Sequence, residues 1–215
     1  MDVAEVLASL RSDGLAVQTL VVADHADQLP RVSAGPWVLL PSSDGSATIG
    51  AFDRGVFSAY ARARDEAELR TVVTKLLTPQ PAARPVSAGQ LQRWKEAAQQ
   101  VTAELTERVA AGESVTVTEL PAGLALDHIG HDSGHTLFLL GTPFGQRSAP
   151  PTDLRLPRTG YLLKKRLPPQ TGLSPVQPWF GQRGGGLLVS LDAPIRAYCE
   201  AGYLQAFDVA PQPVT

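Results

Sequence analysis

The segment from Pro175 to Gly186 reads Pro-Val-Gln-Pro-Trp-Phe-Gly-Gln-Arg-Gly-Gly-Gly. Its last three residues are consecutive glycines, which can adopt positive φ values and allow other groups to approach the backbone closely. An aromatic pair, Trp179 and Phe180, stands shortly before them. On their own, the glycines would fit a flexible hairpin tip equally well. The segment is not a Walker loop, because no Gly-Lys-Ser/Thr sequence follows it.

A second loop, residues 141–151, reads Gly-Thr-Pro-Phe-Gly-Gln-Arg-Ser-Ala-Pro-Pro. Its single arginine, Arg147, has forked donors that suit a planar anion such as phosphate, although a solvated surface arginine is the plainer interpretation. Positive charge gathers nearby, since residues 147–183 hold seven Lys and Arg against one Asp, a local charge of +6. This segment would therefore attract an anionic ligand.

A third segment, residues 126–140, contains three of the chain's four histidines, His128, His131 and His135. The spacing His-x2-His-x3-His raises the question of a metal site. However, glycines interrupt the segment, and no cysteine accompanies the histidines. Because metal sites usually draw on better-defined ligand sets, we predict no metal here.

Together these segments resemble the tuberculosis-necrotizing-toxin family of NAD⁺ glycohydrolases. Members typically carry Asp-Arg-Phe-Gly, then Gly-Thr-Pro-Phe-x-x-Arg-x-x-Pro-Pro, a Tyr-His-x-Tyr strand, and Pro-Trp-Phe-Gly-Gln-Pro-Gly-Gly-Gly. The second and fourth motifs are nearly intact here and occur in the same order. The similarity covers about residues 118–207 and ends on the expected Ala-Gly-Tyr-Leu at 201–204.

The resemblance implies an α+β domain with a twisted, mostly antiparallel sheet, distantly like the ADP-ribosyltransferases. It implies a toxin or effector domain that splits NAD⁺, or also NADP⁺, into nicotinamide and ADP-ribose. NAD⁺ is then the substrate rather than a cofactor, and a cognate immunity protein is a further implied partner. The matching positions are Gln182 beside the scissile ribose, Arg147 and His128 at phosphate contacts, and Tyr161 and Phe180 as pocket walls. Trp179 is a further residue expected to bind the dinucleotide.

Elementary chemistry agrees with this assignment. Nicotinamide leaves as a neutral ring, so the departing group needs no general acid, and the difficulty lies in stabilising an oxocarbenium-like ribose. A neutral amide that orients hydroxyl groups or water, together with fixed charge on the pyrophosphate, can supply this stabilisation. The paired carboxylates of ordinary glycosidases are then unnecessary.

Three positions depart from the family pattern. His128 and Ile129 stand where the family has Arg-Phe, and Leu162 follows Tyr161 where the family has His. Replacing arginine by histidine removes the bidentate fork and most of the charge at neutral pH. Two alternatives to hydrolysis therefore stay open: an inactive nucleotide-binding or interaction protein with the toxin fold, and ADP-ribosyl transfer to a protein.

The amino-terminal 80 residues form a separate module of unknown role. Apolar patterns and turn signals predict a small α-β-β-β-α unit, with helices near 2–12 and 65–77 and strands at 15–22, 37–40, 48–52 and 56–60. Residues 81–112 are predicted to form a proline-rich linker and a long helix from an N-cap at Ser87 to Gly112. Its apolar stripe should face a core. Residues 113–215 form the carboxy-terminal domain, with strands at 115–120 and 137–140.

Composition adds few constraints. The 215 residues are 43% hydrophobic and 19% charged with a net charge of −2, which fits a folded soluble protein and favours neither nucleic acid nor a membrane as partner. The single cysteine, Cys199, cannot form an internal disulfide, and a buried helical position suits it better than a nucleophilic one. No run of 18 apolar residues occurs. We therefore expect a cytoplasmic protein, or one secreted without a cleaved signal peptide.

Overall fold

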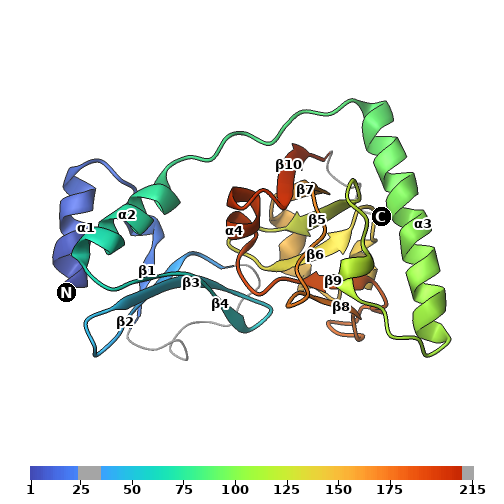
Figure 1. Cartoon of the computed structure of the whole chain (residues 1–215), viewed down its shortest axis with the longest axis horizontal. Helices are drawn as coiled ribbons and strands as arrows, with labels where there is room; N and C mark the ends of the chain where they lie inside the picture. The colour runs from blue at the N-terminus through green and yellow to red at the C-terminus, as the bar shows by residue number, and fades with distance from the viewer. Residues whose placement is uncertain (24–34, 210–215) are drawn as a thin grey trace. The chain divides into compact units, whose positions relative to one another are not determined.

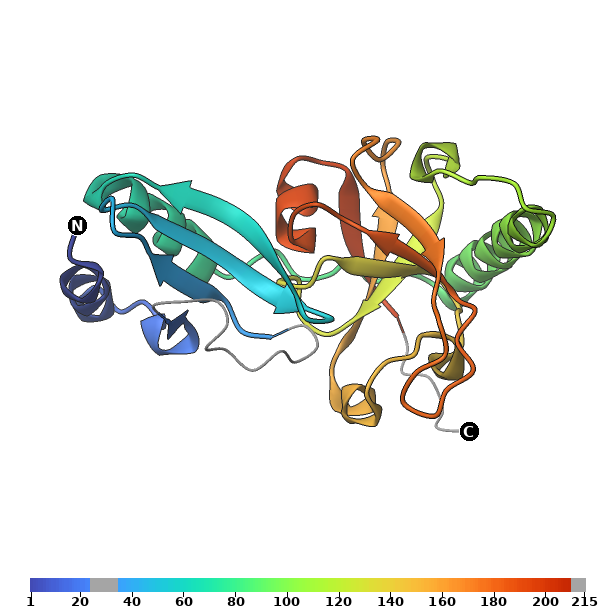
Figure 2. The ribbon, with the colours of Figure 1, turned by 90° about the horizontal axis from the view of Figure 1, so that it is seen from below.

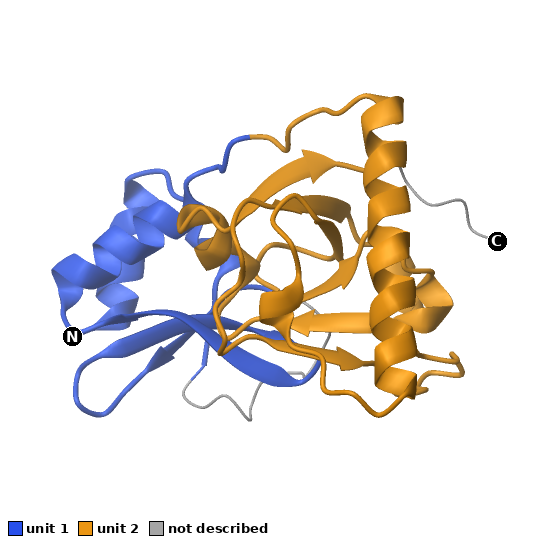
Figure 3. Cartoon of the chain, turned by 45° about the vertical axis from the view of Figure 1, so that its right-hand side comes forward, with its two compact units in different colours: residues 1–81 blue, residues 82–215 orange. Residues whose placement is uncertain are grey.

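The chain divides into two compact units, Met1–Pro81 and Ala82–Thr215 (Figure 3). The computed structural model describes residues 1–23 and 35–209. The boundary between the units falls in the proline-rich stretch. The long helix that the sequence assigned to a linker segment belongs to the second unit.

The first unit packs two helices against a four-stranded sheet of order β1-β2-β3-β4 (Figure 1). Strand β1 runs parallel to β2, whereas β2, β3 and β4 are antiparallel. The core contains fully buried side chains from the sheet and from the second helix, such as Ile49, Leu69 and Val73. The elements are α1 (Val3–Ser12), β1 (Val21–Val22), β2 (Val38–Pro41), β3 (Ala47–Asp53), β4 (Val56–Ala63) and α2 (Glu66–Leu77).

The first predicted strand, at residues 15–22, is mostly wrong. A 3₁₀ turn occupies Val17–Thr19, and only Val21–Val22 is extended. Val17 and Leu20 are both buried, and a separation of three residues places side chains on one side of a helical turn. The apolar run therefore buries its side chains by helical spacing rather than by alternation.

The second unit is built on a six-stranded sheet of order β10-β7-β5-β6-β9-β8, in which every neighbouring pair is antiparallel. This confirms the predicted α+β class with a mostly antiparallel sheet. The strands are β5 (Ala125–Ile129), β6 (Thr136–Leu139), β7 (Arg158–Leu163), β8 (Gly172–Pro175), β9 (Leu187–Ser190) and β10 (Leu204–Asp208).

Two helices, α3 (Ala88–Ala110) and α4 (Ile195–Glu200), lie on opposite sides of this sheet (Figures 1 and 2). The predicted long helix is confirmed, with the Ser87 hydroxyl accepting from the Gln90 amide at its start. Its apolar stripe packs on the core, where the Trp94 ring lies 4.7 Å from that of Phe207. Helix α3 is therefore part of the domain and supports one face of the sheet.

The strand predicted at residues 115–120 is wrong. Val117–Glu119 forms a 3₁₀ turn, because the Glu119 carboxylate accepts from the Thr116 amide in a capping box. The strand predicted at 137–140 is confirmed, shifted by one residue.

The linker before α3 is fastened to the sheet. Arg84 pairs with β10: its amide donates to the Ala206 carbonyl at 3.2 Å, and its carbonyl accepts from the Asp208 amide at 3.0 Å. Since β10 is an edge strand, this contact covers backbone groups that would otherwise be open to another chain.

Gly160 provides a test of how closely β7 and β10 pack. A Cβ at Gly160 would lie 2.3 Å from ring atoms of Phe207, whereas one at Gly172 in β8 would lie 3.7 Å from its nearest neighbour. We expect Gly160→Ala to lower the free energy of unfolding by about 1–3 kcal/mol, as overpacked cores do. The matched Gly172→Ala should be neutral or mildly stabilising. Urea unfolding measures both, and equal effects would contradict the packing described.

Candidate active site

The two glycine- and proline-rich loops interlock. The Gly186 amide donates to the Gln146 carbonyl at 3.0 Å, and the Gly184 amide donates to the Gly145 carbonyl at 3.2 Å. A Cβ on Gly186 would lie 2.7 Å from that Gln146 oxygen. The glycine run is therefore required by the approach of the other loop, and it is not a flexible hairpin tip.

A side-chain bond adds to this contact. The Ser148 hydroxyl, 1% exposed, donates to the Gln177 carbonyl at 2.7 Å. Ser148 holds a positive φ of 47°, which non-glycine residues adopt rarely. Residues 141–151 and 175–186 thus form one structural unit, although about thirty residues separate them along the chain.

Gln182 lies at the centre of that unit. Its Nε2 donates to the Ala149 carbonyl, so the second motif fixes the amide of the fourth. Its Oε1 is shielded from solvent and accepts no hydrogen bond from the residues that the structure describes. Buried polar atoms are normally bonded, so this unused acceptor is a candidate for a hydrogen bond from water or from a ligand hydroxyl that reaches it.

Two aromatic side chains project beside it. Trp179 is 62% exposed and Phe180 is 42% exposed, and their rings stack with centroids 4.5 Å apart. Phe180 holds a φ of 50°, an uncommon backbone conformation that structures retain mainly where the surroundings enforce it. Large apolar rings exposed next to an oriented amide form a surface that suits a planar ring of a ligand.

An ion cluster lies beneath the first loop. The Asp127 carboxylate on β5 is fully buried, and its Oδ1 lies 2.6 Å from Nη2 of Arg147. Its Oδ2 accepts from Nε of Arg158 on β7 at 3.0 Å and also pairs with Nη2 of that residue. One carboxylate therefore connects a sheet strand, its neighbour and the motif loop.

Arg147 is an interior residue. Only 1% of its side chain is exposed, its Nε and Nη2 donate to the Thr142 carbonyl at 3.0 and 2.9 Å, and its guanidinium lies 4.8 Å from the Phe138 ring centre. Burial lowers the pKa of Arg147, although Asp127 acts in the opposite direction. A phosphate could contact this guanidinium only if the loop moved away from it. In the structure, the role of Arg147 is therefore to hold the loop in shape.

His128 does not face this cluster. Successive residues of a strand point to opposite faces, so His128 and Asp127 diverge. The imidazole is 4% exposed, and its Nδ1 lies 2.7 Å from the Thr136 carbonyl oxygen. The predicted phosphate contact would require an accessible side chain, whereas His128 faces the interior.

Tyr161 is likewise in the core. It is 3% exposed, and burial raises its pKa. In the β5–β7 register Tyr161 pairs with Leu126, whereas Gly160 pairs with Asp127, so the tyrosine lies on the face opposite the ion cluster. Of the predicted site residues, the structure therefore brings together Gln182, Phe180, Trp179 and the loop of Arg147, but not His128 or Tyr161.

Sequence reasoning did not single out Asp127 and Arg158 as site residues. A signal was present, because Asp127 directly follows the apolar run Leu124–Leu126. A carboxylate buried in that way needs a cationic partner. The pairing explains two of the seven cations counted between residues 147 and 183, and Lys165 donates to the Ala201 carbonyl. The positive charge of the sequence is therefore only partly available to a ligand.

In the described part of the chain, no three His, Cys, Asp or Glu side chains come together as a metal-binding group. None of the helices described is long and apolar enough to cross a membrane.

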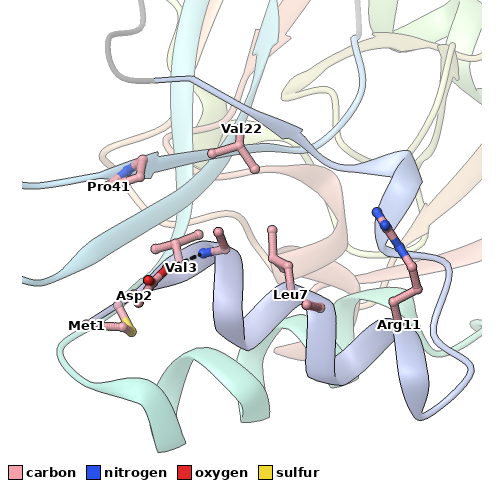
Figure 4. A pocket seen from close by; sticks show the side chains of 9 residues that line it. Met1, Asp2, Val3, Leu7, Arg11, Val22 and Pro41 are labelled. Carbon is pink, nitrogen blue, oxygen red and sulfur yellow. Dashed lines mark hydrogen bonds between the residues drawn. The ribbon is translucent and has the colours of Figure 1, made fainter.

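The first unit has a groove of about 680 Å³ along α1 (Figure 4). Its polar members are Asp2, whose carboxylate caps α1 by accepting from the Ala4 amide at 2.9 Å, and Arg11. The remaining lining is Met1, Val3, Ala4, Leu7, Ala8, Val22 and Pro41. No catalytic set is assembled among these residues.

The second unit is a mixed α+β domain in which two motif loops interlock beside an antiparallel sheet. Residues 119–207 match the model of the family described as Tuberculosis necrotizing toxin, which confirms the resemblance. The conidial surface nicotinamide adenine dinucleotide glycohydrolase nadA of Aspergillus fumigatus is 32% identical over 94 residues. That similarity covers 41% of this chain and 40% of the fungal protein, so the chain matches less than half the length of this relative.

The shared carboxylate predicts a large effect of Asp127→Ala. Removing it leaves two guanidinium groups, 1% and 9% exposed, without their common partner. Breaking such buried pairs costs about 3–5 kcal/mol. Urea unfolding should show this loss, whereas Asp44→Ala, which removes an exposed ion pair with Arg62, should change stability little. A small effect at Asp127 would contradict the role assigned to it.

Cys199 should be unreactive in the folded protein. It lies in α4 as predicted, and burial raises its pKa to about 12, with Asp132 contributing. Since the thiolate is the reactive form, very little is present at pH 8. A chromogenic disulfide reagent should therefore react slowly with the native protein and rapidly in urea. Fast labelling of native protein at pH 8 would show that the thiol is accessible and ionised.

Proposed function

We propose that the second unit hydrolyses NAD⁺, and also NADP⁺, to nicotinamide and ADP-ribose. The observation that carries the proposal is Gln182, whose amide is oriented by the Ala149 carbonyl and whose Oε1 lacks a protein partner in the described residues. The family match over residues 119–207 and the activity for which the fungal relative is named support the same chemistry.

Gln182 is the proposed catalytic residue. Its amide oxygen can accept a hydrogen bond from a ribose hydroxyl or from the attacking water, which positions that group as the bond to nicotinamide breaks. Because nicotinamide departs as a neutral ring, no acid is needed at the leaving group. An oriented dipole that does not reorganise during the reaction stabilises the cationic ribose in the transition state.

Phe180 and Trp179 are the proposed walls for the planar ring. They are exposed, stacked and held by a strained turn, so their surface is already formed before a ligand arrives. A preformed apolar surface reduces the ordering cost of binding. Tyr161 and Arg147 would support the site from the interior, by filling the core and shaping the loop.

A catalytically inactive nucleotide-binding or interaction protein is the second candidate. The observation that favours it is the departure at His128, Ile129 and Leu162, together with the inward orientation of His128. ADP-ribosyl transfer, the distant likeness to ADP-ribosyltransferases, a cognate immunity protein and a cytoplasmic or exported location remain predictions from the resemblance.

An NAD⁺ consumption assay on the purified chain tests the proposal. We expect release of nicotinamide and ADP-ribose, and a fall in kcat on the order of 10²-fold for Gln182→Ala, the size typical for loss of one preorganised polar group. Gln170→Ala, at an exposed position outside both motif loops, should retain the wild-type rate.

If micromolar protein consumed no NAD⁺ over hours while NAD⁺ still raised its melting temperature, the inactive binder would replace the hydrolase. An unchanged kcat in Gln182→Ala would remove this residue from the mechanism.

A further inference from the structure

Arg158 is held in an unusual electrostatic setting. Its Nε and Nη2 both bond to Oδ2 of Asp127, and 9% of its side chain remains exposed. The third nitrogen of the guanidinium, Nη1, makes no hydrogen bond with any residue in the described ranges 1–23 and 35–209. One edge of the group is therefore fixed by protein, while the remaining donor is unused.

Two cationic side chains converge on Asp127. The guanidinium groups of Arg147 and Arg158 both pair with its carboxylate. Arg147 is 1% exposed and holds the Thr142 carbonyl, so of the two cations Arg158 is the one that an anion can approach.

The sheet register sets the direction of Arg158. Asp127 pairs with Gly160, and Arg158 lies two residues before that glycine on the same strand. Residues two apart on a strand share a face, so Arg158 is the diagonal neighbour of Asp127 and lies on its side of the sheet. His128 lies on the other face of the sheet and cannot contact an anion on the face that carries Asp127.

A short series of contacts joins Arg158 to Gln182. Arg158 shares Asp127 with Arg147, the chain continues from Arg147 through Ser148 to Ala149, and the Ala149 carbonyl accepts from Gln182. The loop of residues 141–151 thus contacts both the carboxylate that orients Arg158 and the amide of Gln182.

We infer that Arg158 binds the pyrophosphate of the dinucleotide, with Asp127 as the residue that positions its guanidinium. The inference rests on the proposed function in that it names the group that recognises the anionic part of the substrate. Arg158 would thus supply the cationic contact to the pyrophosphate from β7, on the face of the sheet that carries Asp127. A guanidinium held in a fixed orientation by Asp127, with Nη1 left to donate, suits an anionic diphosphate.

The test compares Arg158→Gln and Arg158→Lys with the control Arg155→Gln, an exposed arginine in the adjacent turn. Isothermal titration with inorganic pyrophosphate and with ADP-ribose measures anion binding without chemistry. We expect Arg158→Gln to raise both Kd values at least tenfold and to raise KM for NAD⁺ more than it lowers kcat. Arg158→Lys, which keeps the charge but loses the fork, should fall between Arg158→Gln and the wild type. Arg155→Gln should match the wild type.

Thermal unfolding separates binding from folding. The melting temperature of Arg158→Gln should stay close to the wild type, because Asp127 keeps its ion pair with Arg147 and glutamine can still donate to Oδ2. Unchanged Kd values, or a loss of binding that follows a collapse in melting temperature in both variants, would overturn the inference.

The two proposals can fail separately. Wild-type protein that binds pyrophosphate through Arg158 but leaves NAD⁺ intact would refute the hydrolase and keep the anion site. Hydrolysis with an unaltered KM in Arg158→Gln would refute the anion site and keep the hydrolase.

Discussion

The buried carboxylate of Asp127 is the interaction on which the arrangement of the candidate site depends. It receives Arg147 from the first motif loop and Arg158 from the neighbouring strand, and it is fully enclosed. Charges inside a protein interact strongly and tolerate little displacement, since an unpaired ion there has no water to replace its partner. The loop that carries Arg147 is therefore anchored to the sheet, and through Ala149 and Ser148 it anchors the second motif loop.

This anchoring explains how the neutral amide of Gln182 could be the central group of the proposed site. The two loops are held by backbone bonds between Gly184 and Gly145 and between Gly186 and Gln146, so Gln182 is positioned by a framework without a hydrophobic core of its own. Preorganisation of that kind lets a single dipole act without reorganising during a reaction. The exposed rings of Trp179 and Phe180 complete a surface with polar and apolar parts in fixed relation.

The departures from the family pattern have a structural counterpart. His128 lies on the face of β5 opposite Asp127, where it is buried and its Nδ1 lies 2.7 Å from the Thr136 carbonyl oxygen. The cation on the other face is Arg158, which the sequence pattern did not single out.

Several features follow from local sequence. Short-range patterns were enough to predict the Ser87 cap and the apolar stripe of α3, because helix caps and periodicity act within a few residues. They were also enough to predict the α+β class and to identify both motifs. Tertiary structure alone decided that Arg147 is interior, that Tyr161 and His128 face away from the cluster, and that Arg158 reaches Asp127 from thirty-one residues away. The reason is the pairing register of β5 with β7, which determines the side of the sheet that each side chain occupies and which depends on contacts between distant segments.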